Sequence, residues 1–129
     1  FRDNISRVHV WPLFVGHSHM PLCLRVTAAE GVSQRPADES EAGVEMFFLE
    51  DNDEVRLSRM PYGPVPTVFN PGSVGQPRDQ DRRAACALYD SDAGTYRVRR
   101  LEYDVAAVQA KIRAARLPEF LALRLAYGQ

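Results

Sequence analysis

The chain contains 129 residues, of which 45% are hydrophobic and 26% are charged, and its net charge is −1. This composition is typical of one globular domain or a part of one. A net charge so close to zero argues against a basic surface that would attract nucleic acid. No stretch approaches the roughly 18 apolar residues of a membrane helix, so we expect neither a membrane nor a nucleic-acid partner.

The first three-quarters of the chain predict strands and turns. Strands are expected over residues 8–15, 21–26, 44–49, 54–57, 67–69, 84–89 and 95–103, because apolar or alternating runs there are bounded by turn residues. The polar stretch 27–43 predicts an exposed loop, and 60–66, with three prolines, predicts a connector. In the basic run 97–100 the arginines are expected to face solvent as strand residues.

The end of the chain predicts two helices. Asp104 is a suitable N-cap, and Val105, Val108 and Ile112 fall on one helical face. Pro118 ends the first helix and can begin a second. Strands followed by terminal helices favour an α/β fold, half of a layered sandwich, with residues 1–129 as a portion of one domain.

The two cysteines indicate the redox compartment of the protein, and the first residue bears on where its native sequence starts. Cys23 and Cys86 are far apart and each lies in an apolar run, which predicts buried free thiols. Free thiols favour a reducing compartment, so we expect a cytoplasmic location. The chain begins at Phe1 rather than at a methionine, and we expect the native start to lie upstream.

The stretch Gly16-His17-Ser18-His19 follows the first predicted strand and is the strongest candidate for a functional site. In near-extended backbone, residues two apart point to the same side, so both imidazoles would aim at one place. Neutral imidazole is the commonest metal ligand in proteins. The spacing alone is equally compatible with two polar surface residues. His9, between two valines, is interpreted as an ordinary strand residue.

A second candidate region is the turn that begins with Asn70-Pro71-Gly72-Ser73. Gly72 and the glycine three residues later would leave backbone N–H groups free to face an anion. Asn70, Gly72, Ser73 and Arg78 are therefore candidates for a substrate rim, where an arginine could bind phosphate through two hydrogen bonds. The simpler interpretation is a structural turn, with Arg78 and the arginines at 82 and 83 in surface salt bridges.

Three blocks of sequence resemble the calcineurin-like metallophosphoesterases, in particular the small bacterial phosphodiesterases. Residues 14–21 resemble the family's last signature, Gly-His-x-His; residues 68–79 resemble its Asn-Pro-Gly-Ser-Val-Gly-x-Pro-Arg segment; residues 101–105 resemble the strand that leads into its C-terminal helix. The blocks occur in the family's order and cover the chain from about residue 8 to residue 125.

The resemblance implies a fold and an activity. The family forms four-layer αββα sandwiches, of which this chain would be the C-terminal half: mostly antiparallel strands and then two helices. His17 and His19 would bind two divalent metal ions, which could be manganese, iron, nickel or zinc. The expected reaction is hydrolysis of a phosphodiester or phosphomonoester, in a small molecule or a nucleotide, by a metal-bridged hydroxide.

The other metal-binding motifs of the family, Asp-x-His, Gly-Asp-x-x-Asp and Gly-Asn-His, do not occur in this sequence. The missing N-terminal half of the domain is thus an expected partner, and the chain alone is expected to be inactive. One alternative is a non-catalytic remnant or split-protein interaction module that retains the sheet. A weaker one is nucleotide binding without hydrolysis at the turn of residues 70–75.

Overall fold

A computed structural model describes residues 7–27, 43–60 and 63–129 of the chain. The strands of this part are β1 (Leu13–Phe14), β2 (Pro21–Thr27), β3 (Gly43–Phe48), β4 (Glu54–Arg56), β5 (Arg59–Met60), β6 (Gly63–Pro64), β7 (Thr67–Pro71), β8 (Ala84–Asp90) and β9 (Thr95–Leu101). Two α-helices follow, α1 (Val105–Ala114) and α2 (Glu119–Leu123), and a short 3-10 helix (Arg124–Ala126) ends the fold.

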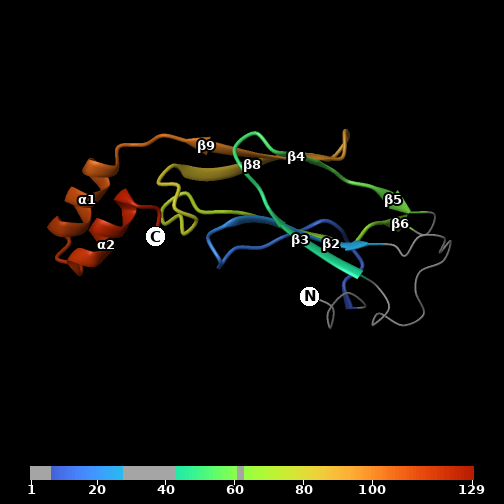
Figure 1. Cartoon of the computed structure of the whole chain (residues 1–129), viewed down its shortest axis with the longest axis horizontal. Helices are drawn as coiled ribbons and strands as arrows, with labels where there is room; N and C mark the ends of the chain where they lie inside the picture. Colours follow the sequence, from blue (N-terminus) through green and yellow to red (C-terminus); the bar gives the residue numbers. More distant parts are fainter. Residues whose placement is uncertain (1–6, 28–42, 61–62) are drawn as a thin grey trace.

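Two sheets lie over one another as layers, and α1 and α2 lie beyond one end of them (Figure 1). The first sheet has the strand order β1-β7-β2-β3, and the second has the order β4-β9-β8. β1 runs parallel to β7, whereas the other pairs, including the small hairpin β5–β6, are antiparallel. The expectation of mostly antiparallel strands followed by two helices is confirmed.

The core lies between the two sheets. Cys23, Phe69, Tyr96 and Val98 are each at most 1% exposed. The Phe69 ring from β7 stacks on the Tyr96 ring from β9, with centroids 3.9 Å apart and an interplanar angle of 11°. Successive strand side chains point to opposite faces, so Tyr96, Val98 and Arg100 all face inward from β9, where each is buried.

The helical end of the chain packs where the sequence predicts it. The Asp104 side chain accepts a hydrogen bond of 2.9 Å from the Ala107 N–H, which caps α1. Gly128 ends the last helix at φ 65°, and a Cβ there would lie 2.7 Å from the backbone of Asp81. The Gly128 carbonyl also accepts a hydrogen bond from the Gln80 N–H. This contact fixes the C-terminus against the loop between β7 and β8.

The first predicted strand is mostly wrong. Of residues 8–15, only Leu13 and Phe14 form a strand, and Val10 is 75% exposed. A run of apolar residues resembles a buried strand locally. The register pairs Leu13 with Val68, so residues 8–11 lie beyond the start of β7 at Thr67 and have no partner there. The predicted loop 27–43 falls largely on residues 28–42, which lie outside the described residues.

Both cysteines are free thiols in the structure, as the sequence predicts. Cys23 is completely buried, and this burial raises the pKa of its thiol to about 11. Cys86 is half-buried rather than buried. Among the described residues, no helix has the length and apolar character needed to cross a membrane.

Candidate metal centre

The histidine turn begins directly after the edge strand β1. The Val15 N–H donates a hydrogen bond of 2.9 Å to the Phe69 carbonyl, which joins the start of the turn to β7. His17 and His19 then take left-handed backbone conformations, with φ angles of 82° and 60°. The prediction that the histidines project from near-extended backbone is therefore wrong, since the chain turns tightly at both positions.

A left-handed conformation costs an ordinary residue about 1–3 kcal/mol and persists only where its surroundings enforce it. Asn70, the fourth residue of β7, provides part of that enforcement. Its Nδ2 donates hydrogen bonds to the Gly16 carbonyl at 3.0 Å and to the Ser18 hydroxyl at 2.7 Å. Its Oδ1 accepts a hydrogen bond from the Gly72 N–H at 3.0 Å. The Asn70 side chain thus joins the two sequence motifs.

A second link joins the turn to the same loop. The Nδ1 atom of His19 lies 2.7 Å from the Gln76 carbonyl oxygen. A carbonyl oxygen can only accept, so this nitrogen must carry a proton, and in a neutral imidazole Nε2 then holds the lone pair that binds a metal. Metal-binding histidines usually have this arrangement, in which a carbonyl or carboxylate orients the ring through the second nitrogen.

The donor set suits a divalent metal but is incomplete. His17 is exposed and His19 is half-buried, in the turn after β1. Among residues 7–27, 43–60 and 63–129, no group of three or more histidine, cysteine, aspartate or glutamate side chains could hold a metal ion. Protein zinc sites usually need three or four protein ligands, so the two imidazoles fit as a part of a site.

The candidates for a substrate rim lie beside this turn, but most of their polar groups form hydrogen bonds within the protein. The Asn70 side chain is 1% exposed and fully hydrogen-bonded, so it faces the turn and not a substrate. Ser73 accepts hydrogen bonds through its hydroxyl from the N–H groups of Gly75 and Gln76. Because the N–H groups of Gly72 and Gly75 are both bonded internally, the predicted free N–H groups for an anion are wrong.

Gly72 has a structural reason to be glycine. Its φ is 90°, and a Cβ there would lie 2.7 Å from the Cβ of Ala85 and 2.8 Å from the Pro21 ring. Arg78 is exposed and donates a hydrogen bond of 3.1 Å to the Gln76 side chain, so among the rim candidates its guanidinium is the one free to reach a ligand.

The arginines at 82 and 83 form ion pairs, as the simpler interpretation states. Arg83 contacts Asp81 at 2.7 Å and Asp51 at 3.0 Å, and Arg82 lies 3.8 Å from Glu102. The hydrogen bond from the Arg83 side chain holds the pKa of Asp81 below its usual range.

A buried arginine that the sequence analysis misses completes this ionic network. The Arg100 side chain is 5% exposed and pairs with Asp79, and its Nε lies 3.8 Å from Asp81. The prediction that the arginines of residues 97–100 all face solvent is wrong for this one, because Arg100 shares the inward face of β9 with Tyr96 and Val98. That period of two was the signal available in the sequence.

The network lines a cleft of about 530 Å³. Met20, the residue after His19, also lines this cleft. Four carboxylates and three guanidinium groups line this cleft: Glu50, Asp51, Asp79, Asp81, Arg78, Arg83 and Arg100. The guanidinium groups of Arg83 and Arg100 are paired with carboxylates of this cleft, whereas Arg78 donates to the neutral Gln76 side chain.

Comparisons with known proteins agree with the fold. The metallophosphoesterase of Sphaerobacter thermophilus, a crystal structure, is 36% identical with a TM-score of 0.66, over 90% of this chain and 41% of that chain. The uncharacterized protein MJ0912 of Methanocaldococcus jannaschii is 32% identical over 117 residues, which are 91% of this chain and 39% of that protein.

A shorter likeness exists to the crystal structure of the hypothetical protein PH1004 of Pyrococcus horikoshii, with 28% identity, a TM-score of 0.45 and coverage of 57% of this chain and 28% of that chain. No protein-family model matches the chain. The fold and sequence likeness to a metallophosphoesterase confirm the resemblance recognised in the sequence. The chain spans about two fifths of the length of the Sphaerobacter thermophilus protein and of MJ0912.

Proposed function

We propose that the chain is the C-terminal part of a metal-dependent phosphoesterase that hydrolyses phosphodiester or phosphomonoester bonds. The observation that carries this proposal is the His19 ring, whose Nδ1 is fixed by the Gln76 carbonyl while Nε2 remains available to a metal. The likeness to the Sphaerobacter thermophilus metallophosphoesterase supports the reaction class.

In this proposal His17 and His19 are the last two ligands of a site for two divalent cations, whether manganese, iron, nickel or zinc. Such a cation pair would acidify the attacking water and neutralise the charge that builds up on the phosphoryl oxygens. The chain's own residues hold and orient the two imidazoles. In this proposal Arg78, which is exposed and bonded to the Gln76 side chain, would contact the phosphoester or nucleotide substrate.

The activity should depend on a removable metal. Full-length protein that is treated with a chelator and desalted is expected to lose hydrolysis of bis(p-nitrophenyl) phosphate, and added Mn²⁺ should restore it. Release of p-nitrophenol measures both steps, and a sample desalted without chelator is the control. Full activity in metal-free protein would contradict the proposal.

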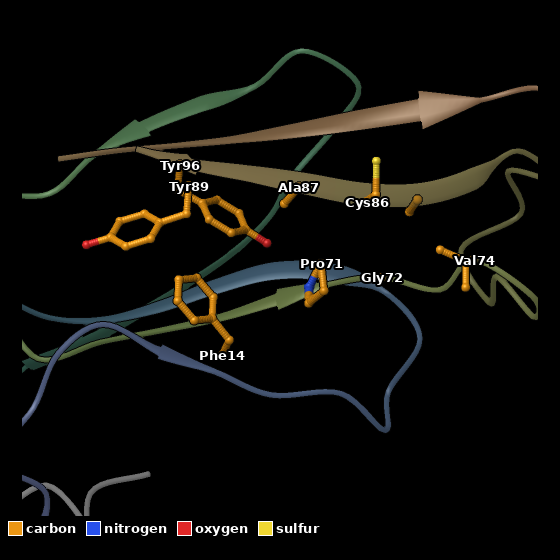
Figure 2. A pocket seen from close by; sticks show the side chains of 9 residues that line it. Phe14, Pro71, Gly72, Val74, Cys86, Ala87, Tyr89 and Tyr96 are labelled. Carbon is orange, nitrogen blue, oxygen red and sulfur yellow. The ribbon is translucent and has the colours of Figure 1, made fainter. Parts of the chain in front are cut away.

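The remaining ligands would come from the missing N-terminal half of the domain, and one side of the sandwich suits its docking. An apolar cleft of about 470 Å³ opens between the edge strands β1 and β8. Figure 2 shows Phe14 pointing into it from one sheet and Tyr89 and Ala87 from the other. Phe14 and Tyr89 are 50% and 40% exposed, with ring centroids 5.2 Å apart.

Unpaired strand edges beside an apolar cleft are a template for further strands. Among the residues that the structure describes, β1 has a neighbour on one side only, and so does β8. Strands of the N-terminal half that continue both sheets would bury Phe14 and Tyr89 and bring further ligands next to the histidine turn, which directly follows β1.

If the N-terminal half docks at this cleft, Tyr89 is buried in the full-length protein, and its removal should lower the free energy of unfolding. Tyr89→Ala in the full-length protein should lower the free energy of unfolding by about 3–5 kcal/mol, the range for a buried aromatic. Tyr127→Ala, at a tyrosine that is 66% exposed, is the matched control and should cost under about 1 kcal/mol. Urea unfolding followed by circular dichroism measures both. Equal, small losses would indicate that the cleft stays open.

A further inference from the structure

The two motifs that stand out in the sequence form one hydrogen-bonded unit. Residues 16–19 and 70–76 are more than 50 positions apart, yet three side-chain contacts join them: Asn70 to Gly16, Asn70 to Ser18, and His19 to Gln76. The segment of residues 70–76 therefore supports the histidine turn.

We propose that Asn70, acting through the Ser18 hydroxyl, is the positioning residue of the His17/His19 pair. It fixes the turn in which both histidines keep left-handed backbone conformations, so that Nδ1 of His19 meets the Gln76 carbonyl. The proposal rests on the proposed metal site for its functional meaning, although the conformation of the turn can be tested without metal.

The chemistry at position 70 requires an amide. Oδ1 accepts from the Gly72 N–H, and Nδ2 donates to the Gly16 carbonyl, so exchanging the two atoms would place like groups against one another. An ionised carboxylate has no donor for the Gly16 carbonyl, and a serine side chain ends in one polar atom where asparagine has two. Burial of the side chain to 1% exposure leaves no room for water to replace these bonds.

Ser18 is the residue through which Asn70 holds the turn, and its substitution should disturb the fold less than a substitution of Asn70. Its hydroxyl lies between the two histidines in sequence and accepts from Asn70 Nδ2. Its side chain is half-buried, and its φ is not positive, so alanine fits its backbone. Ser18→Ala removes the hydrogen bonds that the hydroxyl accepts from Asn70 Nδ2 and, at 3.4 Å, from the Met20 N–H, and it leaves the Asn70–Gly16 and Asn70–Gly72 bonds in place.

The test compares three single variants of the full-length protein: Asn70→Ala, Ser18→Ala and Thr67→Val. Thr67 is the matched control, because it also lies buried in β7 and loses one side-chain hydrogen bond, 3.0 Å to the Val65 carbonyl, away from the turn. Two quantities are measured: Mn²⁺ affinity by calorimetry, and the His19 ring tautomer by ¹⁵N nuclear magnetic resonance of metal-free protein.

Asn70→Ala is expected to weaken Mn²⁺ binding by about tenfold or more, the range for residues that orient metal ligands, and Ser18→Ala by a smaller factor. In both variants the His19 ring should lose its single Nδ1–H tautomer, whereas Thr67→Val should keep both the tautomer and the affinity. If Asn70→Ala does not fold, Ser18→Ala decides the result.

The failures of the two proposals are distinguishable. Wild-type protein that binds no Mn²⁺ yet shows the single Nδ1–H tautomer, lost in Ser18→Ala, would overturn the metal site and support the positioning role. Wild-type protein that binds Mn²⁺, with affinity and tautomer unchanged in Asn70→Ala and Ser18→Ala, would overturn the positioning role. An equal loss of affinity in Thr67→Val would also overturn it, because the effect would then follow stability alone.

Discussion

Replacement of His19 by alanine in the full-length protein is expected to lower phosphodiester hydrolysis by roughly 10³-fold, and His17→Ala should have an effect of similar size. Metal ions contribute several kcal/mol of transition-state stabilisation, and each 1.36 kcal/mol corresponds to a factor of ten in rate. Loss of one imidazole from a site with few ligands should displace a cation, so the effect appears in kcat. The measurement is steady-state hydrolysis of bis(p-nitrophenyl) phosphate with saturating Mn²⁺.

Two further variants separate chemistry from folding. His9→Ala is the control histidine, since its side chain is exposed and outside the turn, and it should keep full activity. His19→Asn is informative because asparagine tolerates the left-handed conformation that position 19 requires. It should fold normally and still lose activity. Wild-type rates in either His17→Ala or His19→Ala would remove the turn from the proposed site.

Much of the fold was predictable because its signals are local. β2, β8 and β9 are runs of apolar or alternating residues between clear turns, and α1 begins at the capping residue Asp104. The histidine turn and the segment of residues 70–76 were recognisable as motifs. Each of these depends on residues close in sequence, where backbone propensity and hydrophobic period decide the outcome.

The contact between those motifs was not predictable from either one. Asn70 looked like a rim residue because Asn-Pro-Gly-Ser is a turn, and its inward orientation depends on the parallel pairing of β1 with β7. The backbone of His17 and His19 was wrongly expected to be extended, since positive φ in two non-glycine residues is imposed by distant hydrogen bonds. Neither the parallel pairing nor a side-chain bond across more than 50 residues leaves a periodic signal.

Arg100 is a second residue whose environment was not predicted from the sequence, and its burial has a larger effect on the free energy of unfolding. Four residues, Arg97 to Arg100, contain three arginines and look like a solvated basic strand. The three arginines differ in burial. Arg97 and Arg99 are exposed, whereas Arg100 is buried and its guanidinium contacts Asp79 and Asp81. Its Nη1 and Asp79 Oδ1 have no hydrogen-bond partner among the described residues, which makes this pair dependent on its mutual attraction.

Arg100→Ala is therefore expected to lower the free energy of unfolding by about 3–5 kcal/mol, because the largely buried Asp79 carboxylate would lose its cation. Arg99→Ala is the neighbouring control: its side chain is 44% exposed and 3.9 Å from Asp51, so the loss should stay below about 1 kcal/mol. Urea unfolding of the full-length protein measures both values.

A double variant then distinguishes the attraction from the cost of burying charge. Arg100→Met combined with Asp79→Leu removes both charges and keeps apolar volume, and exchanges of this kind are often neutral or stabilising. We expect the double variant to be more stable than Arg100→Ala alone. A loss in Arg100→Ala no larger than in Arg99→Ala would show that the Asp79 carboxylate is solvated or protonated without its partner, and that the inward face of β9 tolerates an unpaired acid.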